Sequence, residues 1–289
     1  MGIPSGIIFG LLSMLGYGLA NAISKVPARE VGSERSVFLR GILVSLILFV
    51  VFLVFIGESK FSAGYILVAL LIGILGYFPL LFYYKAVTCG NVGIVTTIAN
   101  SSLVVTILLS VFFFNEILSS MQILSIIIIL FGITLISINF RNIRGSDFFK
   151  KSSGVPFALL AIPLWGLVYF LAKLPIAHLG PYLSAFVFEF GVMAASFVHL
   201  KHIKAETSFP KAGKHMAYIV LLAIFIAAGT LFYNLGINIA DVSIIIAITY
   251  SNPFIAVLYG KFIYKEKIKP LQYLAILMII SGIVLVSLS

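Results

Sequence analysis

Charged residues are scarce in this sequence. Of its 289 residues, 10% are Asp, Glu, Lys or Arg and 62% are apolar, whereas about 25% of the residues of a soluble domain are charged. A soluble protein of this length could not bury so much apolar surface in one core. Stretches of about 20 apolar residues, enough to cross a hydrocarbon layer about 30 Å thick, recur with only short polar connections between them. The scarcity of charge excludes a soluble domain and predicts a membrane protein.

Signatures of other protein classes are also missing. The single cysteine, Cys89, excludes an intramolecular disulfide. The sequence contains no His-Glu-x-x-His run, no Gly-x-Ser-x-Gly elbow and no P-loop, the local patterns of zinc peptidases, serine hydrolases and nucleotide-driven proteins. A metal site at His199 and His202 is disfavoured, since both lie in or beside a basic loop. We therefore expect no catalytic residue, no metal and no cofactor.

The apolar stretches predict ten membrane-spanning helices. Those of the first half cover 3–24, 36–56, 63–87, 91–114 and 120–139. Those of the second half cover 153–174, 181–200, 215–238, 242–263 and 270–288. No basic segment precedes the first stretch, so we expect a span there and not a cleaved signal peptide.

The polar and basic stretch from Arg141 to Ser153 is the longest break near the middle of the chain. It predicts a linker between two halves of an all-α membrane protein. The expected organisation is a five-helix unit at 1–140, a basic linker at 141–152 and a second five-helix unit at 153–289.

The two halves resemble each other. An offset of about 150 residues aligns the fourth and fifth predicted helices with the ninth and tenth without a gap. The aligned pairs include Phe82-Tyr83 with Phe232-Tyr233, Ser101 with Ser251, Glu116 with Glu266, Gln122 with Gln272 and Gly132 with Gly282. Near the start of each half the offset is about two residues shorter, and it aligns Tyr17-Gly18 with Trp165-Gly166 and Lys25 with Lys173. Because five is an odd number, the second half must enter the membrane the opposite way up, which predicts an inverted repeat.

Further motifs carry a family resemblance. The first half contains Leu39-Arg40 and Tyr83-Tyr84-Lys85-Ala86, and the second contains Asn252-Pro253-Phe254 and Tyr264-Lys265-Glu266. With these motifs the chain resembles the drug/metabolite transporter superfamily, specifically its EamA-type members with two five-helix repeats. The resemblance covers nearly the whole chain and implies transport of amino acids, other metabolites, nucleotide-sugars or sugar phosphates.

The two halves differ at two positions where the residue type suggests a function. Leu103 stands where the second half has Pro253, and Phe188 stands where the first half has Arg40, with Glu189 beside it. Glu189 lies about nine residues, or roughly 13 Å, into its predicted helix, near the midplane, where a charge costs roughly 2.5–3.5 kcal/mol on insertion scales. Glu189 either binds the proton that drives transport, provides the counter-charge for a substrate amine, or pairs with a Lys or Arg of a neighbouring helix.

Arg40 is the second intramembrane charge. It lies roughly four residues into the second predicted helix and could reach the interface. The resemblance instead implies that it faces the cavity and binds a substrate carboxylate or phosphate. An Arg40–Glu189 pair is possible, because their repeat positions are nearly equivalent. Lys25, Lys85 and Lys173 lie close to helix ends, and we expect them to extend to the interface.

Polar and aromatic side chains complete the candidate substrate-binding set. Small polar clusters occupy corresponding, near-central parts of the fourth and ninth predicted helices and either hold helices together or contact substrate. Pro253 removes one helical hydrogen bond, which predicts a kink and a spare acceptor at the Thr249 carbonyl. Most membrane aromatics serve packing or the interface, but some recur near polar residues, and Tyr17 and Trp165 each lie beside a glycine. The candidates besides Arg40 and Glu189 are Tyr17, Tyr83, Asn100, Ser101, Trp165, Tyr169, Tyr233, Thr249, Tyr250 and Asn252.

Loop charge predicts the orientation. The formal net charge is +10, and the basic residues cluster after the first, fifth, seventh and ninth predicted helices. This pattern indicates contact with anionic lipid, not nucleic acid. The positive-inside rule places these loops in the cytoplasm and both termini outside the cell membrane, although many EamA-type sequences look the other way round. Glu116 and Glu266, at the turns after the fourth and ninth helices, are expected to cap the following helix.

The leading hypothesis is a secondary transporter that exports a small amphipathic or amino-acid-like metabolite by alternating access. Without a nucleotide motif, uphill transport must draw on a proton, an ion or an exchanged solute. The alternative within transport is an exchanger of anionic sugar phosphates or nucleotide-sugars, which needs several cations at one cavity. A membrane-embedded enzyme or receptor, the alternative of another class, is disfavoured by the missing catalytic motifs and by the repeat.

Overall fold

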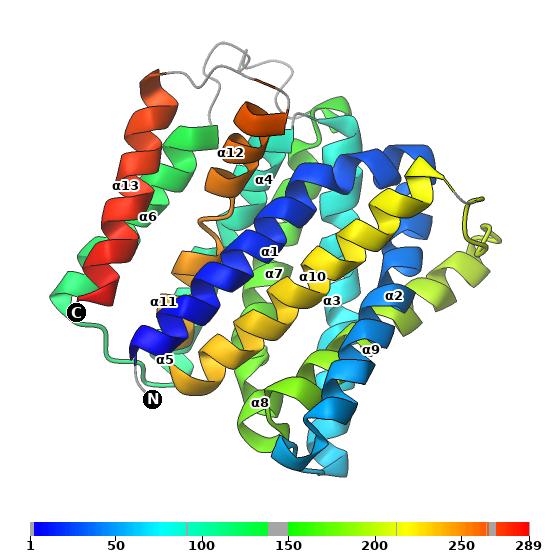
Figure 1. Ribbon diagram of the computed structural model, residues 1–289, viewed down its shortest axis with the longest axis horizontal. Helices are drawn as coiled ribbons and strands as arrows, with labels where there is room; N and C mark the ends of the chain where they lie inside the picture. Colours follow the sequence, from blue (N-terminus) through cyan, green and yellow to red (C-terminus); the bar gives the residue numbers. More distant parts are fainter. Residues whose placement is uncertain are drawn as a thin grey trace.

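The computed structural model describes residues 3–90, 92–137, 150–211, 213–263, 265 and 270–288, and within these ranges it contains helices and short connections but no strand (Figure 1). The helices of the first half are α1 Ile3–Glu30, α2 Ser33–Val54, α3 Ala63–Cys89, α4 Val92–Asn100, α5 Ser102–Phe113 and α6 Ser120–Ser137. Those of the second half are α7 Val155–Leu171, α8 Lys173–Leu179, α9 Pro181–His202, α10 Lys214–Ile239, α11 Val242–Thr249, α12 Pro253–Ile263 and α13 Pro270–Ser287.

Each predicted span corresponds to one helix or to two consecutive helices. Among the described residues, nine helical stretches are long and apolar enough to cross a membrane, and Ser120–Leu135 is apolar but shorter. The predicted all-α, multi-pass membrane fold is therefore confirmed. The linker predicted at 141–152 falls mainly on 141–149, outside the described residues, and a three-residue 3₁₀ helix, Lys151–Ser153, precedes α7.

Two spans predicted as continuous helices are divided at prolines. Pro253 cannot donate the amide that would continue the helix, and α11 ends at Thr249 while α12 begins at Pro253. Pro175 likewise leaves the Leu171 carbonyl without its helical amide partner, and α7 gives way to α8 at Ala172. The kink predicted from Pro253 is thus present, whereas the break in the sixth span was not predicted.

A third span is divided without a proline. The helix predicted over 91–114 separates into α4 and α5 at Ser101. The Ser101 amide donates to the carbonyls of both Thr97, at 3.2 Å, and Ile98, at 3.1 Å, and the Val104 amide donates to the Ser101 carbonyl at 3.1 Å. The bonds from Ser101 to Ile98 and from Val104 to Ser101 span three residues, and they tighten the chain locally into 3₁₀ geometry.

The first span is longer than predicted. The prediction ended it at residue 24, but α1 continues to Glu30 with Pro27 inside it. The polar residues that suggested an end have partners within the bundle: Ser24 Oγ donates to the Asn21 carbonyl at 3.0 Å, and Lys25 Nζ donates to the Gly90 carbonyl at 2.9 Å. Satisfied polar groups do not need to leave the membrane, so the helix continues past them.

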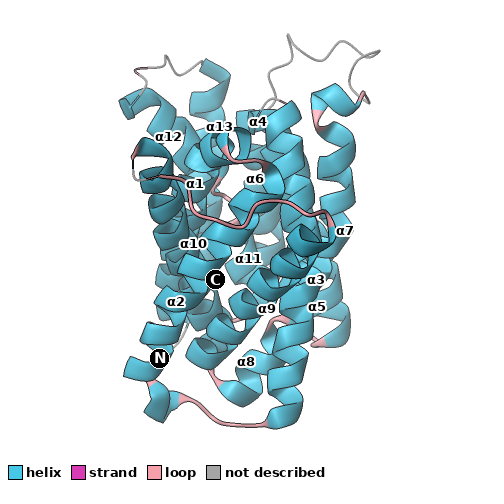
Figure 2. Cartoon of the chain, turned by 90° about the vertical axis from the view of Figure 1, so that its right-hand side faces the viewer, coloured by secondary structure: helices cyan, strands magenta, loops and turns pink. Residues whose placement is uncertain are grey.

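The halves interlock around a pseudo-two-fold axis. The second-span helices α2 and α9 pack together, and α1 packs against α10 as α7 packs against α3 (Figures 1 and 2). The last helices, α6 and α13, cross at repeat-equivalent glycines. A Cβ atom on Gly132 would lie 3.1 Å from the Ala275 carbonyl oxygen, and one on Gly282 would lie 3.0 Å from the Ser125 carbonyl oxygen. The crossing is therefore symmetric, because residues 125 and 275 are also repeat equivalents.

The inverted arrangement gives the bundle two different ends. The connections from α1 to α2 and from α9 to α10 share one end with Arg29, Arg35, Lys201, Lys204 and Lys211, and we call it the basic end. Both chain termini lie at the opposite end, which we call the terminal end. The basic residues predicted after the fifth and ninth spans lie mostly outside the described residues.

Candidate functional site

A central cavity of about 80 Å³ lies between the two repeats. One buried water needs roughly 10–15 Å³ on such a measure, so the cavity has room for roughly five to eight waters or one small solute. Its lining residues on α1, α2, α3 and α10 lie in the halves of these helices nearer the basic end. The cavity thus extends from the middle of the bundle toward that end.

Nine of the twelve predicted site residues line this cavity. They are Tyr17, Arg40, Tyr83, Asn100, Trp165, Tyr169, Glu189, Tyr250 and Asn252. Tyr233 lines a smaller neighbouring cavity, and its hydroxyl donates to the Tyr169 carbonyl at 3.1 Å. Ser101 and Thr249 line neither cavity. Ser101 is exposed and its hydroxyl donates to the Thr97 carbonyl at 3.3 Å, whereas Thr249 is fully buried.

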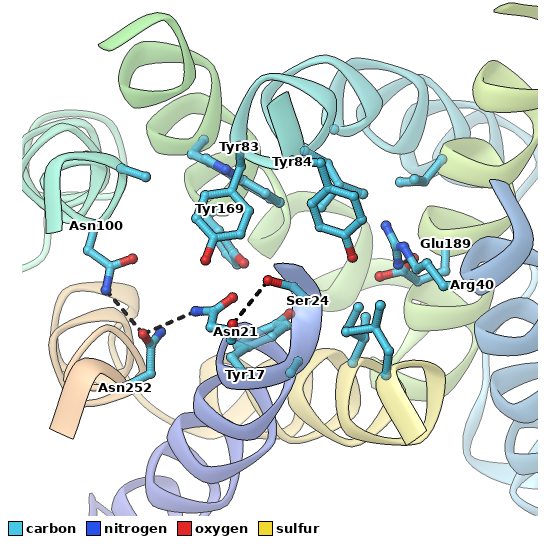
Figure 3. Close-up of a pocket in the computed structure, with 18 of the residues that line it drawn as sticks. Tyr17, Asn21, Ser24, Arg40, Tyr83, Tyr84, Asn100, Tyr169, Glu189 and Asn252 are labelled. Atoms are coloured by element: carbon cyan, nitrogen blue, oxygen red, sulfur yellow. Dashed lines mark hydrogen bonds and ion pairs between the residues drawn. The ribbon is translucent and has the colours of Figure 1, made fainter. Parts of the chain in front are cut away.

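An ion pair closes one side of the cavity (Figure 3). Arg40 Nη1 lies 2.7 Å from Glu189 Oε2, and the two side chains are 2% and 4% exposed. The other Glu189 oxygen accepts a hydrogen bond of 3.0 Å from the Thr230 hydroxyl, which lies 3.0 Å from the Tyr17 hydroxyl. Each charge offsets the other's burial cost. The pair considered from the repeat positions is therefore present, and both members reach the cavity.

An amide cluster occupies the opposite side, where the divided helices meet (Figure 3). Asn100 Nδ2 donates to the Tyr250 carbonyl at 3.1 Å and to Asn252 Oδ1 at 3.2 Å, and Asn21 Nδ2 lies 3.3 Å from the same Asn252 oxygen. The Tyr250 carbonyl thus accepts a side-chain hydrogen bond at the break, and the spare acceptor at the Thr249 carbonyl stays a prediction. The breaks in the fourth and ninth spans expose backbone and amide groups to the cavity, where they can bind a polar solute.

Aromatic rings form the walls between these two polar regions. Tyr169 contacts four other rings: it stacks on Trp165 with centroids 5.1 Å apart and packs edge-on against Tyr17, Tyr233 and Tyr250 at 6.4, 5.0 and 5.3 Å. Tyr83 lies 3.0 Å from the Thr96 hydroxyl. The wall can therefore hold a flat or apolar part of a solute.

Three polar residues of the cavity were not predicted from the sequence. Asn21, Ser24 and Tyr84 line the cavity, and neither the Tyr84 hydroxyl nor Arg40 Nε has a hydrogen-bond partner in the described part of the chain, although both atoms are buried. These are free donors for a solute. Helical spacing carried a signal for two of them, because Asn21 and Ser24 follow Tyr17 by four and seven residues and so share its face.

The three lysines near helix ends point away from the cavity. Lys85 Nζ lies 2.9 Å from Glu34 Oε1, and Lys25 bonds to the Gly90 carbonyl. Lys173 Nζ lies 3.5 Å from the Ala240 carbonyl oxygen and 3.7 Å from Glu116 Oε1. None of the three lines the cavity, so Arg40 is its single cationic side chain among the described residues.

Glu116 corrects a prediction. It was expected to cap the helix that follows it, but its carboxylate accepts hydrogen bonds from the Val242 amide at 2.8 Å, the Ser243 amide at 3.0 Å and the Ser243 hydroxyl at 2.6 Å. It thus caps α11 of the other repeat, and α6 is capped instead by reciprocal bonds between Ser119 and Gln122. Glu266, its repeat equivalent, lies outside the described residues.

The charge of Glu116 also affects the connection between α10 and α11. Burial raises the pKa of the Asp241 carboxyl, the Glu116 carboxylate raises it further, and the Lys173 ammonium opposes the shift. This terminal-end cluster is a structural junction between repeats. Within the described ranges, no three His, Cys, Asp or Glu side chains come together as a metal site would need.

Comparison with known proteins places this architecture in a family. A model described as the EamA-like transporter family matches residues 4–138 and again residues 152–288. A comparison with curated proteins finds no match. A solved structure titled "Crystal structure of protein" has a TM-score of 0.77 and 17% identity, and the match covers 99% of this chain and 97% of that one. At that identity the likeness shows the fold alone. The family model matches nearly the whole chain in two copies, and the chain therefore belongs to the EamA-like transporter family, whose members are multi-pass membrane proteins that carry small molecules.

Proposed function

We propose that this protein is a secondary active transporter that moves a small, net-neutral metabolite by alternating access. The observation that carries the proposal is the central cavity between two inverted repeats, with an ion pair on one side and an amide cluster on the other. Inverted repeats allow inward-open and outward-open forms of similar energy around a midplane site. We propose that the nine cavity-lining candidates, together with Asn21, Ser24 and Tyr84, bind the solute.

The charge balance of the cavity favours a net-neutral solute. Arg40 and Glu189 compensate each other at 2.7 Å, so a bound anion would bring an unpaired charge into a low-dielectric site. A sugar phosphate needs several converging cations, but Lys25, Lys85 and Lys173 are engaged at helix ends. A zwitterion places its carboxylate at the free Arg40 and Tyr84 donors and its ammonium near Glu189. The aromatic wall then holds an apolar side chain, as an amino-acid-like or amphipathic metabolite requires.

A metabolite screen tests this substrate class. We expect zwitterionic and neutral metabolites to raise the midpoint of thermal unfolding of the purified protein, because a ligand stabilises the state that binds it. Trp165 is the only tryptophan in the chain and lines the cavity, so its emission should change with the same ligands. A sugar phosphate or nucleotide-sugar as the strongest stabiliser would contradict the proposal and favour the anion exchanger.

We further propose that a proton drives transport through Glu189. Protonation removes the negative charge that holds Arg40, so proton binding and the ion pair exclude each other. A substrate ammonium competes for the same carboxylate. Competition of this kind at one buried carboxylate couples the movement of two solutes.

Orientation sets the direction of transport. We propose that the basic end faces the cytoplasm and that both termini lie outside. The larger cavity extends toward the basic end, and we propose that a solute enters it from the cytoplasm, as export requires.

A carboxy-terminal fluorescent-protein fusion tests the orientation. We expect no fluorescence from a green fluorescent protein that folds only in the cytoplasm, because the positive-inside rule places the C-terminus outside. An amino-terminal alkaline phosphatase fusion, which is active only outside the cytoplasm, should be active and serves as the positive control. A bright carboxy-terminal fusion would reverse the orientation and with it the export argument.

A further inference from the structure

A second, smaller cavity lies on the terminal-end side of the larger one. Its volume is about 20 Å³, which holds one or two waters, since one buried water needs roughly 10–15 Å³. Its lining residues on α3 and α10 include Ala69 and Asn234, which lie in the halves of these helices nearer the terminal end. The two cavities therefore divide the interior of the bundle between its two ends.

Three aromatic side chains separate the cavities. Tyr17, Tyr169 and Phe188 each line both of them. The ring of Phe188 would lie 3.0 Å from a Cβ on Gly76, and the ring of Tyr17 would lie 2.7 Å from a Cβ on Gly229. Rings packed this closely leave no open passage for a solute between the cavities.

A hydrogen-bonded chain nevertheless crosses this barrier. Thr230 lines the smaller cavity and donates to Glu189 Oε1 at 3.0 Å, while Glu189 lines the larger one. Because the Thr230 proton points to the carboxylate, the Tyr17 hydroxyl, 3.0 Å away, donates to the Thr230 oxygen. Glu189 thus lines one cavity and is connected to the other by two hydroxyls.

The smaller cavity also has an unsatisfied polar group. Ser184 lines it, is 2% exposed, and its hydroxyl has no hydrogen-bond partner in the described part of the chain. Buried hydroxyls are rarely left without a partner, and a water needs two to four polar neighbours. Ser184, Tyr17, Thr230 and Asn234 supply them.

From this arrangement we propose that the smaller cavity binds water and is the route by which protons reach Glu189 from the terminal end. The inference rests on the proposed proton coupling at Glu189. In the transfer, a hydronium in the smaller cavity gives a proton to the Tyr17 oxygen, Tyr17 gives its own to Thr230, and Thr230 gives its own to Glu189. Each hydroxyl gains one proton and loses one, a water is left behind, and Glu189 becomes neutral.

The groups around Glu189 agree with this direction of approach. Arg40 faces it from α2, Tyr84 from α3, Tyr17 from α1 and Thr230 from α10. On the larger-cavity side the guanidinium of Arg40 repels an approaching hydronium. On the smaller-cavity side the described neighbours are neutral hydroxyls and an amide. Substrate and proton therefore approach the same carboxylate through different cavities.

Infrared spectroscopy tests the water. In a Cys89→Ser background, Ser184→Cys introduces one thiol into the smaller cavity, and its S–H band should shift within seconds to minutes of transfer to D₂O. Ser110→Cys is the matched control, because Ser110 is fully buried with no hydroxyl partner in the described structure and lines neither cavity. It should exchange much more slowly. Equal, slow exchange of both thiols would show that the cavity is dry and would overturn the proposal.

The route is tested by the infrared C=O band of protonated Glu189, which is identified because it is missing in Glu189→Gln. The measured quantity is the rate at which this carboxyl exchanges its proton for deuterium. In lipid nanodiscs at a pH where this band is present, we expect Thr230→Val to slow its deuteration by roughly tenfold, about the effect of one net hydrogen bond. Thr230→Ser should restore the rate. Ser184→Val, which fills the smaller cavity, should slow it equally, and Ser110→Val should not.

Two outcomes would distinguish a failure of the proposed proton route from a failure of the proposed proton coupling at Glu189. If Glu189 deuterates at the wild-type rate in both Thr230→Val and Ser184→Val, protons arrive through the larger cavity, and the route is wrong while the coupling stands. If no Glu189 carboxyl band appears as the pH is lowered over the range in which the protein transports, Glu189 does not take up a proton, and both the coupling and the route are wrong.

Discussion

Replacing Glu189 with glutamine is expected to abolish transport against a gradient while leaving the protein folded. Glutamine keeps one carbonyl acceptor, so one of the two contacts at 2.7 and 3.0 Å survives, and its NH₂ group is a donor where the second carboxylate oxygen was an acceptor. It cannot take up a proton, and it leaves the Arg40 charge uncompensated. Proteoliposomes with an imposed pH gradient and a ligand from the thermal screen measure the effect.

The matched control for this substitution is Glu34→Gln. Glu34 also pairs with a basic residue, Lys85 at 2.9 Å, but it lies at a helix end, its side chain is 27% exposed, and it lines neither cavity. It should transport like the wild type. Unchanged uptake and unchanged pH dependence in Glu189→Gln would refute proton coupling at this residue.

Replacement of the pair separates its structural from its transport role. Removing one partner of a buried ion pair costs about 3–5 kcal/mol, because the other charge stays buried alone. Both Arg40→Met and Glu189→Met should therefore lower stability strongly. The double variant Arg40→Met/Glu189→Met should recover most of the stability, since two apolar side chains replace two compensated charges, yet it should not transport. Additive losses would show that the two residues do not depend on each other.

Glu116→Ala is expected to be the most damaging change at the terminal end. It removes the acceptor of three hydrogen bonds, from two amides and one hydroxyl of Val242 and Ser243, and hydrogen bonds to a charged group are worth about 1.5–3 kcal/mol each. These bonds are not additive, and we expect a loss of about 3 kcal/mol, or roughly 6–12 °C in the midpoint of thermal unfolding. Thermal unfolding in detergent, followed by Trp165 emission, measures it.

Two comparisons sharpen this prediction. Glu116→Gln keeps one carbonyl acceptor and should lose roughly half as much stability. Glu58→Ala removes an exposed carboxylate from the same end of the bundle and should change the midpoint little, because exposed charges contribute little to stability. A Glu116→Ala midpoint equal to that of Glu58→Ala would show that the junction between the repeats does not depend on Glu116.

The amino-acid sequence by itself determined the number of spans, the two halves and most of the polar residues of the cavity. Insertion into a bilayer depends on the hydrophobicity of each segment, so the spans could be found one at a time. The repeat then placed residues such as Tyr17 and Trp165, or Asn100 and Tyr250, at corresponding positions. Corresponding positions in an inverted repeat meet at its axis, and Asn100 indeed bonds to the Tyr250 carbonyl.

The tertiary structure decided which groups are partners and which remain free. Glu189 pairs with a residue 149 positions away, and Glu116 caps a helix that begins 126 positions further along the chain. Local sequence favoured the nearest helix for Glu116, but the amides of α6 are already capped by Ser119 and Gln122. The free Tyr84 hydroxyl, the exposed Ser101 and the division of the interior into two cavities likewise depend on packing between helices. Hydrophobicity acts along each segment, whereas hydrogen bonds and ion pairs join residues that only the folded chain brings together.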